Sequence, residues 1–295
     1  MNLNKLLPLL MIIAMFLWAS SFVSAKVLIL YINEHELVTY RYLITTLTMA
    51  PIIWVFKIPF KISLKNLFFA IISAVCLVSY TKLFFLGTGA STANFGGALI
   101  TTLMPIIVYV LLVFSGKKRP LKKDWMALLL GVIGVSVMLK VWQFNYDEIF
   151  NSATVLLLWA ALSFALLSIV TSYSSDINPL SFSFYIYLIS TVLNSAIYFE
   201  IVNGSILDMD KIFWFNMALM SVGSTTFATT IYFVGMQKLG AKATVYTFLV
   251  PFFVMLLGML FLQEFINLNT IIGAVLTITA LLIINNVKFS DFKSS

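Results

Sequence analysis

The chain has 295 residues, of which 61% are hydrophobic and only 10% are charged, and its formal net charge is +7. Soluble domains average about 45–50% apolar and about 25% charged residues, so this composition excludes a water-soluble domain and predicts a membrane protein. The single cysteine, Cys76, excludes an intramolecular disulfide and a thiolate metal cluster, and we expect no metal or other cofactor. In a membrane protein, an excess of positive charge is typical of loop orientation, and we expect no nucleic-acid partner.

Ten apolar blocks follow one another along the chain, separated by short loops that carry most of the Lys, Asp and Glu residues. A helix needs about 20 apolar residues to cross roughly 30 Å of hydrocarbon. The first block is too long for a signal peptide and leads directly into further blocks, so we expect it to be retained. The sequence therefore predicts ten transmembrane helices, at residues 7–26, 37–57, 66–87, 93–114, 124–142, 152–171, 181–201, 212–234, 241–262 and 268–287.

The first five blocks resemble the last five in the order of their landmarks. Leu17-Trp18-Ala19 in the first block returns as Leu158-Trp159-Ala160 in the sixth, and the fourth and ninth blocks each carry one proline, Pro105 and Pro251. Because five is odd, the second half must begin on the opposite side of the membrane from the first. The predicted fold class is an all-α membrane protein of two inverted five-helix repeats, over residues 1–146 and 147–295.

Pro105 and Pro251 each follow a stretch of small and hydroxyl-bearing residues. A proline within a helix frees a backbone carbonyl and bends the axis. In lipid, the freed carbonyl must be satisfied by a neighbouring helix, a hydroxyl or a water-lined cavity. Two bends at matching positions predict a pair of gating elements, and a purely structural kink is the alternative that the sequence leaves open.

The basic residues predict the orientation of the chain, because cytoplasmic loops carry an excess of Lys and Arg. With the N-terminus in the cytoplasm, the inner loops hold 13 of the 18 basic residues, namely Lys5, Lys57, Lys61, Lys65, Lys117, Lys118, Arg119, Lys122, Lys123, Lys238, Lys242, Lys288 and Lys293. We therefore expect both termini on the cytoplasmic side.

Several residues in this order resemble the ten-helix EamA-like family of the drug/metabolite transporter superfamily. Trp18-Ala19-Ser20-Ser21-Phe22 is similar to the Trp-Gly-Ser-Ser-Phe of that family, and Arg41 matches an arginine after the turn into the second span. The small residues before the two prolines fit as well, as does Glu264 just past the ninth span, followed nine residues later by Gly273. The resemblance covers nearly the whole chain.

The chain departs from the family pattern at three positions. Lys118 stands where the first half often has an acidic residue, Ala19 replaces a glycine, and Gln263 replaces the glycine before Glu264. The resemblance implies a multi-pass carrier of the bacterial inner membrane that moves small metabolites, often outward. Because members of the family handle amino acids, nucleosides, sugars and drugs, the resemblance names no cargo, and it leaves monomer or homodimer open.

Charged residues within spans are costly, at roughly 2.5–3.5 kcal/mol each on insertion scales, and therefore require a reason. Arg41 lies near the outer end of the second span and Lys82 near the outer end of the third, where both side chains can reach the headgroups. We interpret Arg41 and Glu264 as structural charges. The functional hypothesis for Lys82 is that it faces a central cavity together with Tyr80 and attracts an anionic group.

The eighth span is rich in hydroxyl groups that recur on one helical face. Such a stripe lines a cavity or bonds to neighbouring helices, and the sequence does not separate the two. The residues that we predict to line a substrate cavity are Trp18, Ser21, Tyr80, Lys82, Tyr109, Trp159, Ser163, Tyr185, Thr225, Thr229 and Tyr232.

Three classes of function compete on the sequence alone. A membrane enzyme needs a nucleophile pair or a His, Asp and Glu cluster for acid–base work, and the single histidine and the lack of paired carboxylates within spans argue against one. A channel or other non-transport membrane protein is disfavoured only by analogy with repeat transporters. We therefore predict a secondary transporter of small metabolites such as amino acids, acting by alternating access in the outward direction; an uptake permease of the same fold is the alternative.

Overall fold

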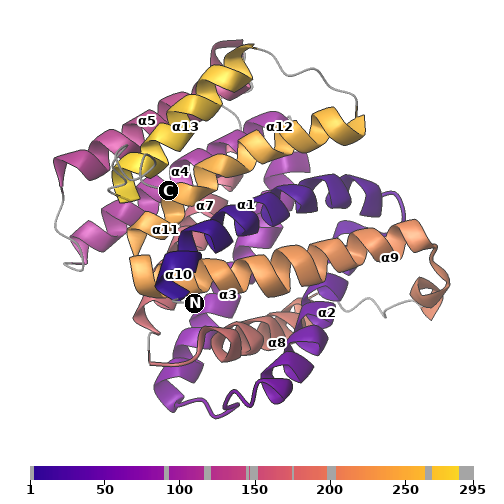
Figure 1. Ribbon diagram of the computed structural model, residues 1–295. Helices are drawn as coiled ribbons and strands as arrows, with labels where there is room; N and C mark the ends of the chain where they lie inside the picture. Colours follow the sequence, from indigo (N-terminus) through magenta and orange to yellow (C-terminus); the bar gives the residue numbers. More distant parts are fainter. Residues whose placement is uncertain are drawn as a thin grey trace.

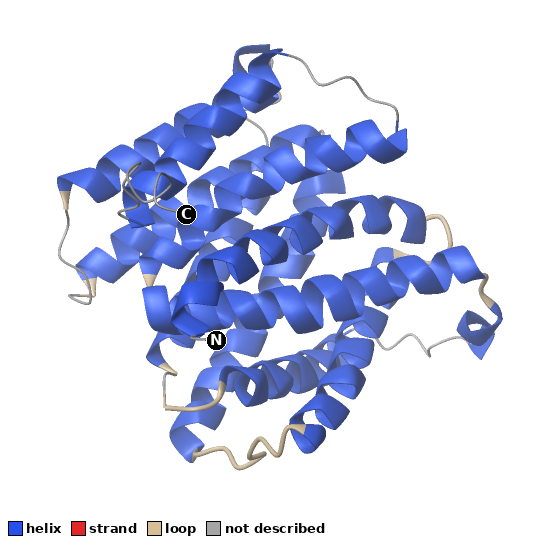
Figure 2. Ribbon diagram, viewed as in Figure 1, coloured by secondary structure: helices blue, strands red, loops and turns tan. Residues whose placement is uncertain are grey.

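The structure is a computed structural model in which the regular structure of the described residues is entirely helical. Figure 2 shows these helices joined by short loops. The description covers the whole chain apart from residues 1–2, 90–92, 116–120, 144–145, 147–151, 175, 198–203, 263–267 and 286–295.

Five long helices form the first half, and each overlaps one predicted span. They are α1 (Leu3–Leu28), α2 (Glu34–Val55), α3 (Leu64–Gly89), α4 (Ala93–Phe114) and α5 (Lys122–Leu139), followed by the short 3₁₀ turn η1 (Val141–Gln143).

The helices of the second half are more interrupted. They are α7 (Ser152–Tyr173), α8 (Pro179–Ile197), the 3₁₀ turn η2 (Gly204–Asp208), α9 (Lys211–Ala218), the π-helical segment η3 (Leu219–Thr229), α10 (Thr230–Leu239), α11 (Ala241–Val245), the 3₁₀ turn η4 (Tyr246–Phe248), α12 (Leu249–Leu262) and α13 (Leu268–Asn285). The predicted span at 212–234 thus runs without a gap through α9, η3 and α10, and the span at 241–262 runs without a gap through α11, η4 and α12.

Four helical stretches are both long enough and apolar enough to cross a membrane, at Leu6–Ala25, Leu64–Gly87, Ser152–Tyr173 and Lys211–Leu239. Three further apolar helices are shorter over their described residues, at Leu103–Phe114, Lys242–Leu257 and Ile271–Ile284. Large apolar side chains cover much of the outer surface, among them Trp54, Leu64 and Phe114. Such a surface suits lipid rather than water.

The second helix of each half begins with an asparagine cap. Asn33 Oδ1 accepts a hydrogen bond from the backbone amide of Glu36 at 2.9 Å, and the Glu36 carboxylate accepts one from the amide of Asn33. Asn178 Oδ1 accepts a hydrogen bond from the amide of Leu180 at 2.9 Å, immediately before α8. These side chains satisfy amides that have no partner within the helix, so similar local chemistry starts α2 and α8.

The main helix packings come in matched pairs when the two halves are exchanged. Helix α3 packs on α7 as α1 packs on η3, and α4 packs on α7 as α1 packs on α12. Helix α2 packs on α8, and α5 packs on α13, so these two contacts join equivalent helices (Figure 1). The two halves therefore form one interlocked bundle in which α1 and α7 make corresponding contacts.

Helices α5 and α13 approach closely because small residues face each other. A Cβ atom built on Gly273 would lie 2.4 Å from the carbonyl oxygen of Gly134, and one built on Gly134 would lie 2.9 Å from the carbonyl oxygen of Gly273. Small residues allow backbones to approach in this way in membrane helix pairs. The α5–α13 pair lies at one side of the bundle in Figure 1, and the α2–α8 pair at the opposite side.

Candidate functional site

A cavity of about 140 Å³ lies between the two halves of the bundle. Helices α1, α2, α3 and α4 supply its wall from the first half, and α7, α8, η3, η4 and α12 supply it from the second. On α1 the lining residues belong to the last half of the helix, on α2 to the first half and on α3 to the last half. This central cavity therefore lies toward the end of the bundle where α1 leads into α2.

Equivalent positions of the two halves line the central cavity. The spacing that separates Pro105 from Pro251 also separates Met104 from Val250, Trp18 from Phe164, Ser21 from Leu167 and Arg41 from Tyr187, and all eight residues of these four pairs are in the lining. Equivalent positions of the two halves thus face the same cavity. In one of the four pairs the two side chains differ in chemistry, because Arg41 carries a charge and Tyr187 carries a phenol.

Aromatic rings from both halves meet at Trp18. Its ring centroid lies 4.9 Å from that of Tyr232 and 5.8 Å from that of Phe164, and the Tyr80 ring lies 4.9 Å from Phe164. Trp18 Nε1 donates a hydrogen bond to Thr229 Oγ1 at 3.1 Å. This bond joins α1 to η3 at the wall of the cavity.

Arg41 is held in the cavity wall by a hydroxyl group of η3. Its Nε donates a hydrogen bond to Thr225 Oγ1 at 2.8 Å, and Thr225 Oγ1 in turn donates to the carbonyl oxygen of Met220 at 2.9 Å. The Thr225 proton is therefore directed to the backbone, and its oxygen accepts from the guanidinium. This arrangement fixes the side chain of Arg41 without neutralising its charge.

The π-helical winding of η3 explains why its hydroxyl groups act in this way. Thr225, Thr226 and Thr229 each donate a hydrogen bond to the carbonyl oxygen five residues earlier, at 2.9, 3.2 and 3.2 Å. The oxygen atoms are then available to donors from the first half, which include Trp18 and Arg41. Segments of π-helix are frequent at functional sites.

With this geometry in place, comparison with known proteins decides the family. The family model described as the EamA-like transporter family matches residues 6–140 and again residues 151–286. The chain belongs to the EamA-like transporter family. A crystal structure described only as "Crystal structure of protein" has a TM-score of 0.79 against this EamA-like protein, with 13% sequence identity over 99% of both chains, and therefore shares its fold. A search of curated proteins gave no match.

Membership makes this EamA-like protein a multi-pass membrane protein of a family of transporters. The two family matches fall one in each half, so the two-part architecture expected from the sequence is present. Among the described residues, no group of three or more His, Cys, Asp or Glu side chains is placed to hold a metal ion.

Four of the predicted lining residues do line the central cavity, namely Trp18, Ser21, Tyr80 and Thr229. Thr225 contributes through its bond to Arg41. Tyr232 lies directly behind the wall, where it packs on Trp18 and its hydroxyl is within 3.0 Å of Ser168 Oγ.

The structure places other predicted residues away from the cavity. Trp159 is 57% exposed on the outer surface of α7, and Ser163 donates a hydrogen bond to its carbonyl oxygen. The Tyr109 hydroxyl donates to Asp124 at 3.3 Å and accepts from the amide of Leu121, at the start of α5.

Lys82 lies in a second cavity of about 30 Å³, beside Glu34, His35 and Asn194. This smaller cavity shares Thr81 and Phe85 with the central one. Of the two charges that the sequence places within spans, Arg41, interpreted from the sequence as structural, is the one that lines the central cavity.

The two predicted gating prolines lie in buried positions within α4 and α12. The residue before each, Met104 and Val250, lines the cavity. In the second half, the helical winding changes to a 3₁₀ turn, η4, just before Pro251. Glu264 lies outside the described residues.

Sequence reasoning missed several lining residues. The aromatic ones are Phe22, Tyr42, Phe84, Phe85, Phe164 and Tyr187. In a chain with 27 Phe and 12 Tyr residues, an aromatic side chain carries no signal by itself. The spacing of the two prolines, applied to Trp18 and Arg41, would have found Phe164 and Tyr187.

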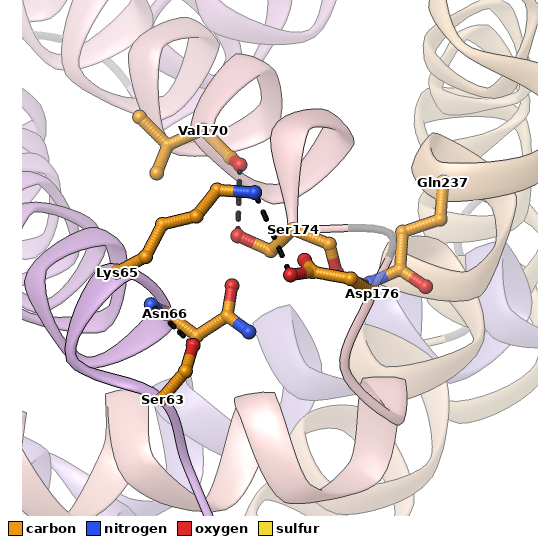
Figure 3. A network of polar contacts seen from close by, with 7 residues as sticks. All are labelled: Ser63, Lys65, Asn66, Val170, Ser174, Asp176 and Gln237. Carbon is orange, nitrogen blue, oxygen red and sulfur yellow. Dashed lines mark hydrogen bonds and ion pairs between the residues drawn. The ribbon is translucent and has the colours of Figure 1, made fainter.

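At the opposite end of the bundle, polar contacts join the halves of this EamA-like protein (Figure 3). Lys65 Nζ of the first half lies 3.5 Å from Asp176 Oδ2 of the second, and within the second half Gln237 Nε2 donates to the carbonyl oxygen of Ser174 at 2.8 Å. We call Lys65, Asn66, Ser174, Asp176 and Gln237 the Lys65 cluster.

Two further hydrogen bonds cross between the halves beside the Lys65 cluster. Ser181 Oγ donates to the carbonyl oxygen of Pro59 at 3.0 Å, and the Tyr185 hydroxyl donates to the carbonyl oxygen of Phe60. Tyr185, predicted to line the cavity, therefore ties α8 to the loop between α2 and α3.

Proposed function

We propose that this protein is a secondary transporter of small metabolites, in which ten transmembrane helices form two inverted five-helix repeats that alternate access to the central cavity. The observation that carries this proposal is the lining of the central cavity by equivalent residues of both halves. In transporters built from inverted repeats, the substrate binds at the repeat interface near the middle of the membrane.

The packing pattern supports an inverted repeat. If each helix is replaced by its equivalent in the other half, the α3–α7 contact becomes the α1–η3 contact. The α4–α7 contact likewise becomes the α1–α12 contact. The same replacement leaves the α2–α8 and α5–α13 contacts in place. A two-fold axis through the bundle produces such a pattern, and with five helices in each half the axis must lie in the membrane plane.

The two ends of the bundle support a transport cycle. Between the halves, one end has the central cavity and the other has the Lys65 cluster, which crosses from α3 to the α7–α8 loop. Lys57, Lys61 and Lys65 lie at the start of α3 or in the loop before it, so the excess of basic residues favours this end as cytoplasmic. We therefore assign the described conformation as closed toward the cytoplasm, in a bacterial inner membrane with both termini inside.

The direction that we propose is export, with an uptake permease of the same fold as the alternative. The experiment begins by comparing the metabolites released by cells that express the protein and by cells that lack it. The compound that differs is then loaded into liposomes that contain the purified protein. We expect uptake of labelled compound to be stimulated by unlabelled compound on the opposite side.

Two substitutions make the transport experiment specific to the cavity. Trp18→Phe removes the hydrogen bond to Thr229 at the cavity wall, whereas Trp54→Phe alters a tryptophan that is 75% exposed at the end of α2. Exchange should slow in the first variant and not in the second. Flux that shows no stimulation from the opposite side would identify a channel and contradict the proposal.

A further inference from the structure

Arg41 is a charged group without a counter-charge in a chain that crosses a membrane. Its only hydrogen-bond partner among the described residues is the neutral hydroxyl of Thr225, and no described acidic side chain forms an ion pair with it. Arg41 is partly buried, and a charge that loses part of its hydration without gaining a counter-charge is costly. The position of Arg41 in the wall of the central cavity indicates that the missing partner is a ligand.

The hydrogen bond to Thr225 leaves the guanidinium able to bind an oxyanion. A guanidinium has five N–H donors in a planar fork, and Thr225 uses the single one on Nε. The two terminal nitrogens match the two oxygens of a carboxylate in a bidentate pair. Thr225 is therefore a positioning residue that orients this fork.

The rest of the lining defines the body of the ligand. Trp18, Phe22, Tyr80, Phe84 and Phe164 surround the cavity with aromatic rings. None of the acidic side chains that the structure describes is in the lining. An ammonium group would therefore find hydroxyl groups but no carboxylate there, and a buried charge without a partner is disfavoured.

We propose that the central cavity binds a small organic monoanion, with its carboxylate on Arg41 and an apolar or aromatic body, without an ammonium group, among the rings around Trp18. This inference rests on the proposed function, whose substrate class it names. The cavity volume of about 140 Å³ suits a ligand of on the order of ten non-hydrogen atoms, if each water-sized group needs about 10–15 Å³.

Three probes with a common phenyl body separate the charge types. Phenylpropanoate carries only a carboxylate, phenylalanine carries a carboxylate and an ammonium group, and phenethylamine carries only an ammonium group. Equilibrium binding to the purified full-length protein in detergent should be tightest for phenylpropanoate. We expect a preference of about 10-fold or more over phenethylamine, which has no carboxylate for Arg41 to bind. A similar preference is expected over phenylalanine, because its ammonium group would find no carboxylate partner in the lining.

Substitutions at Arg41 and Thr225 test the role of the guanidinium. Arg41→Gln should weaken phenylpropanoate binding about 10- to 100-fold while leaving phenethylamine binding unchanged or tighter. Thr225→Val keeps the charge and loses only its anchor, so a smaller loss of about 2- to 10-fold is expected. Lys211→Gln removes an exposed cation at the same end of the bundle, outside the cavity, and should change neither affinity.

The outcomes separate this inference from the proposed function. Arg41→Gln weakening both probes equally would mean a structural role for Arg41 and overturn the inference. Preferred binding of phenylalanine or phenethylamine, or no binding of phenylpropanoate to the unaltered protein, also overturns it. Because counterflow tests translocation and detergent binding does not, phenylpropanoate binding without exchange supports the anion site and contradicts the transporter. Exchange of a cationic compound without phenylpropanoate binding supports the transporter and contradicts the anion site.

Discussion

Hydroxyl groups of η3 connect the two halves of the protein at single residues. The hydroxyl groups of Thr225 and Thr229 each donate a hydrogen bond to a backbone carbonyl five residues earlier. Each also accepts a hydrogen bond from the first half, Thr225 from Arg41 and Thr229 from Trp18. A hydroxyl oxygen that donates in a fixed direction has a fixed acceptor direction as well. The cavity wall is therefore ordered by pairs of hydrogen bonds, in addition to the packing of rings.

The bond between Trp18 and Thr229 gives the first prediction. Trp18→Phe and Thr229→Val each remove one partner, and each should lower the stability of the purified protein by about 1 kcal/mol, the net contribution of an ordinary hydrogen bond. Because both substitutions break the same bond, the double variant should be more stable than the sum of the two single losses predicts. Thermal unfolding in a mild detergent measures this. Strict additivity would contradict a direct coupling.

The residues of the cavity show where sequence reasoning succeeds and where it fails. Trp18 and Ser21 were predicted from their place in the first span, and both line the cavity. Trp159 was predicted because Leu-Trp-Ala recurs, but the proline spacing pairs Trp18 with Phe164, and Trp159 is exposed on the outer surface. A shared tripeptide does not fix the helical phase, and a shift of a few residues turns a side chain from the cavity to the lipid.

At the scale of the helices, glycines determine how closely α5 and α13 approach. Gly134 and Gly273 bring backbone against backbone, and a Cβ atom on Gly273 would also lie 2.4 Å from Cγ of Met138. The sequence predicted both helices from their apolar composition. It could not predict this contact, because a glycine in an apolar helix looks the same whether it faces another helix or the lipid.

Substitution of these glycines provides the second prediction. Gly273→Ala places a methyl group against the carbonyl of Gly134, which cannot move without displacing a helix, so we expect destabilisation of about 1–3 kcal/mol. Gly223→Ala is the matched control, since the nearest atom to its Cβ would be a flexible leucine carbon at 3.4 Å. The unfolding midpoint of Gly273→Ala should be lower than that of Gly223→Ala. Equal midpoints would show that α5 and α13 separate easily.

The π-helical winding of η3 also lay beyond prediction from sequence. Its run of hydroxyl residues indicated either a cavity lining or bonds to neighbouring helices, and the structure shows both. Ser224 and Thr229 line the cavity, whereas Thr226 lies 3.0 Å from Thr48 of α2. Side-chain hydroxyls of this segment bond to carbonyls five residues earlier, but the same residues fit a regular α-helix equally well in the sequence alone.

At the scale of the whole molecule, the two ends of the interface between the halves differ in chemistry. The end with the central cavity has aromatic rings and one charge held by a hydroxyl, and the other end has the exposed ion pair of Lys65 and Asp176. Exposed ion pairs contribute little to stability. The ion pair of Lys65 and Asp176 therefore holds this end only weakly, which suits the transport cycle that we propose.

The Lys65 cluster should be insensitive to pH in the physiological range. A hydrogen bond from its own backbone amide, with Lys65 and Asn66 nearby, lowers the pKa of Asp176 below its usual value. A lowered carboxyl pKa means that the stabilising contact is present above the ordinary value of about 4 and is lost only as pH falls through the lowered pKa. A fluorophore at Lys61→Cys, with Cys76→Ser, should report no change between about pH 5.5 and 8. A transition in that range that Asp176→Asn removes would contradict this prediction.

The two charges of the cluster can be exchanged to test whether they hold this end closed. Lys65→Asp and Asp176→Lys should each increase the population of an open conformation, by no more than about five-fold because the side chains are 60% and 51% exposed. Distances between spin labels at Lys61→Cys and Asn178→Cys, with Cys76→Ser, measure that population across the closed end.

The combined exchange should restore only part of the closed population, since the backbone amide of residue 176 would then face an ammonium group instead of a carboxylate. Since the pair is screened by salt, high ionic strength should shift the distances in the unaltered protein in the same direction as either single substitution, but by less, because salt weakens an attraction without adding a repulsion. If neither the single substitutions nor salt changes the distances, the uncharged contacts of Ser181 and Tyr185 with the first half are sufficient to keep this end closed.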